Sequence, residues 1–369
     1  MDNCVIPHGY KATALGIIPQ EWEVMLLGNL SNSISSGRNK HRDAHGQYPV
    51  FGSTGIIGYS STYEYEGPVI LVARVGANAG TLNFASGQYD VSDNTLIITI
   101  KQNVYDYNFA YNQLTHYKLN KLVFGSGQPL ITSKQLKNIR TPVPPLAEQR
   151  KIAEVLGVWD KAIEKQARLI EKLALRKRAL MQRLLSAKLR LPGFSEPWKK
   201  VKLGDVAELY QPQTIQSEDL SQTGYPVYGA NGLIGYYNNY NHEYPQVVIT
   251  CRGSSCGTVN FTPGKCWITG NAMVLNVDNN RDVNKSFFYY LISNSSFVNL
   301  ISGSGQPQIV RQPLLKFELR IPPLKEQTAI AEVLTAADRE IDLAKEKLER
   351  LRRQKRGLMQ QLLTGKKRI

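Results

Sequence analysis

The stretch PPLAEQRKIAEVL at Pro144–Leu156 determines the organisation of this chain, because it returns 178 residues later as PPLKEQTAIAEVL at Pro322–Leu334. A second pair of matching stretches lies upstream, where YPVFGSTGIIGY at Tyr48–Tyr59 returns as YPVYGANGLIGY at Tyr225–Tyr236. A chain of 369 residues is long enough to bury a separate core in each half. The repeat therefore predicts two similar structural units and two similar binding surfaces.

Each copy of the Pro-Pro-Leu stretch opens a helical pattern of about 40 residues, which corresponds to a helix of roughly 60 Å. Apolar residues recur at alternating spacings of four and three, as in the seam of a coiled coil. Pro145 and Pro323 suit a first helical turn, and Glu148 and Glu326 are favourable near the positive end of the helix dipole. The seam positions are Ile152, Leu156, Trp159, Ile163, Gln166, Ile170, Leu173, Lys177, Leu180 and Leu184, then Ile330, Leu334, Ala337, Ile341, Ala344, Leu348, Leu351, Lys355, Leu358 and Leu362.

We expect the two seams to be buried against each other. Lys177 and Lys355 interrupt them at equivalent positions. Three interpretations stay open for these lysines: they extend along the apolar surface to water, they pair with an acidic residue, or they mark a point where the helices diverge.

The remaining segments are rich in Gly, Asn, Ser, Thr and Tyr and carry short apolar runs bounded by turn residues. The runs typical of strands are Val69–Val72, Thr95–Ile100, Val247–Thr250 and Ala272–Val277, and the spacing predicts helices at Asn108–Lys118 and Lys285–Leu300. The expected class is α+β, with two similar globular α/β domains separated by two long antiparallel coiled-coil helices in a pseudo-twofold repeat. The expected bounds are 1–145 and 190–323 for the globular domains, and 146–189 and 324–369 for the helices.

The net charge of +15 is concentrated in the helical segments, which carry +7 in residues 146–190 and +5 in residues 324–369. Two basic runs on equivalent elements favour a polyanionic partner such as nucleic acid, although a solvated helix face is the simpler interpretation of either run alone. No apolar run is long enough for a transmembrane helix, and the start of the chain does not resemble a secretory signal. We expect a cytoplasmic protein.

Known catalytic motifs are missing. There is no phosphate-binding loop, and the five histidines form no pattern typical of a triad or a two-metal site. Cys251, Cys256 and Cys266 invite a zinc interpretation, but the matching stretch Ala73–Tyr89 contains neither Cys nor His. A metal that holds the fold together should be needed by both copies, so we expect small buried thiols, no metal and no catalytic residues.

The ordered, duplicated motifs resemble the specificity subunit of type I restriction–modification systems, which act in host defence. The resemblance rests on the P-P-L-x-E-Q entrances, the I-A-E-V-L runs, the G-S-G-Q-P loops and the W-x-x-x-x-L-G-[DN] openings at Trp22–Asn29 and Trp198–Asp205. It covers essentially the whole chain. It implies that residues 1–145 and 190–323 are target-recognition domains that each read one half of a split DNA site, while residues 146–189 and 324–369 are conserved spacer helices.

The resemblance also implies partners. The helices would dock methyltransferase subunits, a restriction/translocase subunit would join these, and double-stranded DNA would be the ligand. S-adenosylmethionine, ATP and Mg would belong to the partner subunits, whose complex would be an adenine-N6 DNA methyltransferase and ATP-dependent endonuclease. This chain would hold no cofactor and catalyse nothing. Two readers on one DNA face are separated by about one helical turn, roughly 34–36 Å, and helices of this length bridge that distance.

Residues that read bases are expected where the two copies disagree. The longest disagreement sets Ser35–Gln47 against Tyr210–Gly224. Arginine and lysine bind guanine or phosphate, and asparagine and glutamine pair with adenine. The candidates are Arg38, Asn39, Lys40, Arg42, Gln211, Gln213 and Gln216, with a solvated loop that makes no contacts as the alternative.

Residues on which the copies agree are candidates for shared contacts. Arg74 and Arg252 precede glycine-containing turns and either touch phosphate or support the fold. Gln128 and Gln306 lie in the repeated SGQP loops and either approach DNA or form a structural turn. Two alternative functions stay open: a coiled-coil scaffold or adaptor whose globular domains bind a non-DNA partner, and a standalone nuclease or methyltransferase.

Overall fold

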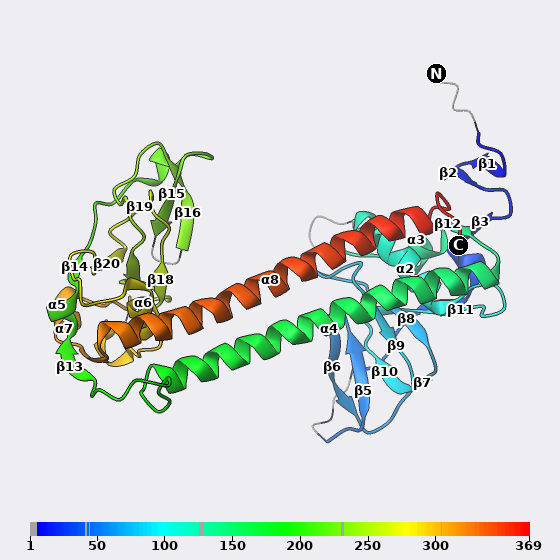
Figure 1. The fold of residues 1–369 in the computed structure, drawn as a ribbon. Coiled ribbons are helices and arrows are strands. Elements are labelled where there is room, and N and C mark those ends of the chain that lie inside the picture. Colours follow the sequence, from blue (N-terminus) through cyan, green and yellow to red (C-terminus); the bar gives the residue numbers. More distant parts are fainter. Residues whose placement is uncertain (1–5, 41–42, 44, 125–128, 230–231, 304) are drawn as a thin grey trace. The chain divides into compact units, whose positions relative to one another are not determined.

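The computed structural model describes residues 6–40, 43, 45–124, 129–229, 232–303 and 305–369 (Figure 1). The chain divides into two compact units. The first unit contains Met1–Ala167 together with Glu346–Ile369, and the second contains Arg168–Lys345. Each unit therefore combines one globular part with part of both long helices.

The long helices are α4 (Leu146–Leu184) and α8 (Leu324–Leu362), which have 39 residues each (Figure 1). All predicted seam positions are buried or half-buried, which confirms the heptad pattern. The pairing is antiparallel in each unit. In the first unit, Asp160 contacts Lys355 and Glu148 contacts Arg368, so one residue number rises as the other falls. In the second unit, Leu173 packs with Ile341 and Ala344.

The first unit contains two four-stranded sheets with the strand orders β4-β11-β8-β9 and β6-β5-β10-β7. The pair β5–β10 is parallel and the pair β10–β7 is antiparallel, so the second sheet is mixed. The strands are β4 (Ser31–Ser36), β5 (Tyr48–Gly52), β6 (Gly55–Ser60), β7 (Tyr65–Glu66), β8 (Val69–Ala73), β9 (Leu82–Ala85), β10 (Gln88–Val91) and β11 (Thr95–Ile100).

Smaller elements complete the first unit. Strand β1 (Tyr10–Thr13) pairs with β2 (Gly16–Pro19), and β3 (Glu23–Leu26) pairs with β12 (Arg140–Val143). The helices are α1 (Leu27–Leu30), α2 (Tyr107–Tyr117), α3 (Ser133–Lys137) and the 3-10 turn Leu119–Leu122.

The second unit repeats this plan with the sheets β14-β20-β17-β18 and β16-β15-β19, while β13 pairs with β21. Its strands are β13 (Lys199–Lys202), β14 (Glu208–Tyr210), β15 (Tyr225–Gly229), β16 (Gly232–Tyr237), β17 (Val247–Thr250), β18 (Val259–Phe261), β19 (Trp267–Ile268), β20 (Ala272–Asn276) and β21 (Glu318–Ile321). Its short helices are α5 (Leu203–Val206), α6 (Lys285–Ser293), α7 (Arg311–Leu315) and the 3-10 turns Ser217–Asp219 and Val298–Leu300.

The core of each globular part includes the start of one long helix and the end of the other. In the first unit, Ile152 and Leu156 of α4 and Leu362 of α8 pack with Trp22 in one buried cluster. In the second unit, Leu184 of α4 and Ile330 of α8 belong to the cluster around Phe287. The helices are thus part of the globular cores rather than separate rods.

The predicted helix over Lys285–Leu300 is too long, since α6 ends at Ser293. The polar run Asn294–Ser296 follows, and such residues bond to the local backbone in ways that compete with a helix. None of the helices in the described ranges combines the length and apolar character needed to cross a membrane.

Candidate nucleic-acid interface

The glutamate of each P-P-L-x-E-Q motif is the buried anchor of a helix entrance. Glu326 is 1% exposed in its side chain and accepts two hydrogen bonds from Arg190, from Nε at 2.6 Å and Nη2 at 2.8 Å. In the first unit, Glu148 accepts from Arg368 at 2.6 and 3.0 Å and from Trp22 Nε1 at 3.0 Å. Each arginine follows the end of the partner helix, so the start of one helix is tied to the end of the other.

The glutamine of each motif connects the helix to the globular part. Gln149 accepts from the backbone N–H of Asp106 and donates to the carbonyls of Val104 and Pro144. Gln327 repeats all three bonds with Asn284, Asp282 and Pro322. Asp106 and Asn284 cap α2 and α6. The glutamine of the motif therefore fixes the position of the globular part on its helices through these hydrogen bonds.

The two lysines in the seams pair with acidic residues. Lys355 Nζ lies 2.6 Å from Asp160 Oδ1 in the first unit, and Lys177 Nζ lies 2.5 Å from Asp338 Oδ1 in the second. Of the three interpretations of these lysines, pairing with an acid is the one confirmed. Asp160 and Asp338 are separated by the same 178 residues as the repeat, a signal that the sequence contained.

In the first unit, the variable loop after β4 lies against the mixed sheet. The backbone N–H groups of Arg38 and Asn39 donate to the Val91 carbonyl, and that of Asp43 donates to Tyr59. The Asn39 side chain donates to Asp90, whereas the Arg38 side chain is 82% exposed and lies 3.9 Å from Glu64. Such an exposed ion pair contributes little, so the guanidinium is accessible to a ligand.

Two further candidates, Lys40 and Arg42, belong to this loop. Lys40 is exposed. Arg42 lies outside the described residues.

In the second unit, the variable loop follows β14. The Gln211 side chain donates to the Gly270 carbonyl, and the backbone carbonyl of Gln213 accepts from Trp267 Nε1. Gln211, Gln213 and Gln216 are all exposed. The backbone of the loop is therefore anchored while polar side chains remain at the surface.

Both variable loops end by pairing with the same strand of the repeat. In the first unit, Gln47 N–H donates to Ser60 at the end of β6. In the second, Ser221 and Tyr236 of β16 exchange two backbone hydrogen bonds. The ends of the two divergent loops thus pair with equivalent sheet edges, β6 and β16. The candidate residues nearer the start of each loop lie on the other side of the hairpin, where Arg38 bonds to Val91 of β10 and Gln213 bonds to Trp267 of β19.

Arg74 and Arg252 are not equivalent, which corrects their treatment as a matched pair. The N–H of Arg74 donates to Asn94, and the corresponding bond in the second unit runs from Cys251 to Asn271. Arg252 instead takes the bridge position of Val75, so the repeat is offset by 177 residues here. Arg74 is half-buried and donates to Ser36 Oγ at 3.2 Å, while Arg252 is exposed.

The SGQP loops are described only in part. Gln128 lies outside the described residues, and Gln306 is exposed. The carbonyls of Pro129 and Pro307 each accept a hydrogen bond from a glycine, Gly76 and Gly253 respectively. This repeated bond shows that the end of each loop has a structural role.

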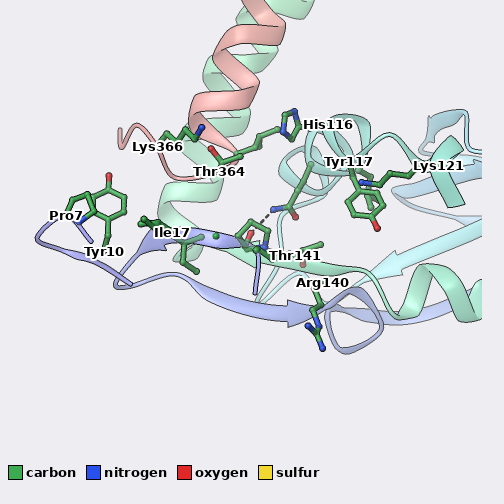
Figure 2. A pocket seen from close by; sticks show the side chains of 17 residues that line it. Pro7, Tyr10, Ile17, His116, Tyr117, Lys121, Arg140, Thr141, Thr364 and Lys366 are labelled. Carbon is green, nitrogen blue, oxygen red and sulfur yellow. Dashed lines mark hydrogen bonds between the residues drawn. The ribbon is translucent and has the colours of Figure 1, made fainter. Parts of the chain in front are cut away.

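A cavity of about 920 Å³ opens in the first unit between β1–β2, the end of α2 and the end of α8 (Figure 2). Two of its polar side chains are engaged, since Gln113 donates to the Pro142 carbonyl and Thr364 donates to the Gln360 carbonyl. Burial, together with Lys118 and Lys121, lowers the pKa of His116. Among the described residues that line it, none is Asp or Glu.

The three cysteines of the second unit are free thiols, and burial raises the pKa of Cys251 to about 11. Over the described ranges, no three His, Cys, Asp or Glu residues gather in a way that would hold a metal ion.

Comparison with known proteins agrees with the two-unit plan. The family model described as "Type I restriction modification DNA specificity domain" matches residues 19–174 and again 195–353. The type I restriction enzyme MjaVIII specificity subunit of Methanocaldococcus jannaschii is 24% identical over 95% of this chain and 94% of its own length. The putative MjaX specificity subunit of the same organism is 26% identical over 98% and 97%.

Solved structures share the fold. The crystal structure of the type I restriction–modification S subunit from M. genitalium aligns with a TM-score of 0.65 at 19% identity, covering 93% of this chain and 96% of that one. A chain from a study of complex assembly and conformational transition of the type I system aligns with a TM-score of 0.57 at 19% identity, covering 94% and 99%. With the family domain matched twice across most of its length, the chain belongs to the family of type I restriction–modification DNA specificity subunits.

Proposed function

We propose that this chain reads a bipartite DNA site, with one half-site for each globular domain, and docks the methyltransferase and restriction subunits of a type I restriction–modification complex. The observation that carries the proposal is the doubled specificity domain, in which both copies present a divergent loop on the same sheet edge. Equivalent placement with different side chains suits two readers of different sequences.

The types of exposed side chain in each unit suggest which residues contact bases and which contact phosphates. Arg38 and Lys40 suit guanine or phosphate in one half-site, and Gln211, Gln213 and Gln216 suit adenine in the other. Arg252 and Gln306 are exposed and suit phosphate contacts, which position the protein without reading sequence. The domain bounds in this proposal are 1–145 and 190–323, with helices at 146–189 and 324–369.

Catalysis belongs to the partner subunits in this proposal. They would bind S-adenosylmethionine, ATP and Mg and methylate an adenine in each half-site, and the complex would act in the cytoplasm on cellular DNA. The exposed basic residues of α4 and α8 would contribute sequence-independent affinity for DNA, which falls as salt concentration rises.

Methylome sequencing of a host that carries this chain with its methyltransferase partner tests the proposal. The expected result is one split motif with a modified adenine in each half. The variants Arg38→Ala and Gln213→Ala form a matched pair. Each should relax the sequence specificity of the methylated motif in one half-site and leave the other half-site unchanged. A host with no new methylated motif, despite a stable complex with the partner, would contradict the proposal and favour a scaffold.

A further inference from the structure

Each unit exposes a large aliphatic side chain near the start of the second strand of the same β-hairpin. Ile56 is the second residue of β6 in the first unit and is 54% exposed, and Leu233 is the second residue of β16 in the second unit and is 51% exposed. The two residues are equivalent, because Ile56 pairs with Phe51 and Leu233 pairs with Tyr228 in the matching registers. The neighbouring labels β5 and β6 locate the first hairpin in Figure 1.

The backbone of both hairpins is built in the same unusual way. Gly55 and Gly232 begin the second strand of each hairpin with φ of +99° and +108°, a conformation that L side chains rarely adopt. A β-bulge then interrupts each strand pair one residue further on, and bulges re-aim side chains. The bulged residue packs over a glycine of the facing strand in each hairpin, Ile57 over Gly52 and Ile234 over Gly229. Ile57 is half-buried, whereas Ile234 is still 49% exposed and adds to the apolar surface beside Leu233. The residue before each bulge remains at the surface.

The surroundings connect these side chains to DNA recognition. Strand β6, which contains Ile56, ends at Ser60, which accepts the hydrogen bond from the variable loop. Strand β16, which contains Leu233, includes Tyr236, which pairs with the other variable loop. An exposed apolar residue that both copies retain therefore lies on the strand that pairs with the end of the variable loop.

We propose that Ile56 and Leu233 are apolar wedges that insert into the base stack of the DNA, one in each half-site. This inference rests on the proposed function. Aliphatic side chains between base steps unstack and kink a duplex, and the inserted side chain needs no hydrogen bond to a particular base edge. A step shared by two half-sites of different sequence suits a repeated residue, while the divergent loops read the bases.

The experiment uses the full chain in its complex with the methyltransferase partner and duplexes of the methylated motif that carry 2-aminopurine at successive positions. Unstacking raises the fluorescence of this base. The wild-type complex should raise it at one step in each half-site. Ile56→Thr should abolish the rise in the first half-site only, and Leu233→Thr in the second only, with affinity weakened about tenfold in each case.

Conservative variants separate wedging from folding. Threonine suits a strand because it is β-branched, but it lacks the apolar tip of either aliphatic side chain. Ile56→Leu and Leu233→Ile keep an apolar tip and should retain the fluorescence rise. Wild-type affinity and fluorescence in the threonine variants would overturn the wedge while leaving the proposed function intact. Loss of complex assembly in those variants, with DNA binding by the chain unchanged, would overturn it in favour of a protein contact. A wild-type complex that binds no specific site would instead refute the proposed function.

Discussion

The ion pair between Arg190 and Glu326 offers the sharpest test of the contacts that the P-P-L-x-E-Q motif makes at the start of each long helix. Replacing Arg190 with Ala leaves a carboxylate that is 1% exposed without its bidentate partner. Removing one partner of a fully buried pair costs roughly 3–5 kcal/mol. Since the Arg190 side chain is 26% exposed, the lower end applies, and we expect a loss of about 3 kcal/mol in the free energy of unfolding of the second unit.

The first unit supplies a matched comparison. Arg368 is 40% exposed, and Glu148 keeps its hydrogen bond from Trp22 when this arginine is removed. Arg368→Ala should therefore cost only about 1.5 kcal/mol. Arg190→Lys, which loses the bidentate geometry, should fall between wild type and Arg190→Ala. Arg178→Ala removes an exposed arginine of α4, the helix that Arg190 follows, and should change stability by less than about 0.5 kcal/mol.

Calorimetry with hydrogen exchange measures these losses and locates them. For a unit of this size, about 3 kcal/mol lowers the melting temperature by roughly 6–12 °C. Amides at the start of α8 should exchange about 100-fold faster in Arg190→Ala, and those at the start of α4 should do so less strongly in Arg368→Ala. Equal losses for the two arginines, or a melting temperature unchanged in Arg190→Ala, would refute the reasoning.

Three further predictions concern other contacts. Gln327→Ala removes three hydrogen bonds at the start of α8 and should lower the free energy of unfolding, measured in urea, by about 2–3 kcal/mol. A loss under about 0.5 kcal/mol would contradict the role of Gln327 in holding the globular part on the helix. A chain of residues 191–369 should form a homodimer by light scattering, because the end of α8 lacks the α4 segment that covers it and a second α8 supplies an antiparallel seam; a monomer would count against this pairing. Burial lowers the pKa of His242 below its ordinary 6.5, so its contribution to stability is complete above pH 6.5 and is lost as the pH falls below that value; His242→Gln should flatten this dependence in urea unfolding between pH 5 and 8, and an unchanged slope would assign it to other groups.

The apolar runs and spacings of the sequence predicted the secondary structure, because secondary structure depends mainly on residues that are close together in the chain. The strands at Thr95–Ile100 and Val247–Thr250 have the predicted bounds. The heptad spacing identified both seams before any contact was known. The pattern did not show that Lys177 and Lys355 pair with Asp338 and Asp160, because the register of two antiparallel helices depends on where the globular cores hold their ends.

The candidate interface was predicted less completely. Comparing the two copies located the divergent loops, but a linear comparison matched Arg74 with Arg252, which strand pairing places one residue apart. The wedge candidates Ile56 and Leu233 lie within a pair of matching stretches, where sequence similarity does not single them out. Sequence similarity does not distinguish an apolar residue needed for a core from one left exposed by a bulge.

What the sequence by itself determined is the duplication, the two coiled-coil seams and the family, since each is a repeated local pattern that one chain displays without a partner. The tertiary structure alone decided which distant residues complete each unit. Leu362 and Arg368 come from the end of the chain yet belong to the first unit, with Trp22 and Glu148. Burial and charge pairing act on neighbours in space, and an antiparallel helix pair makes neighbours of residues 220 positions apart.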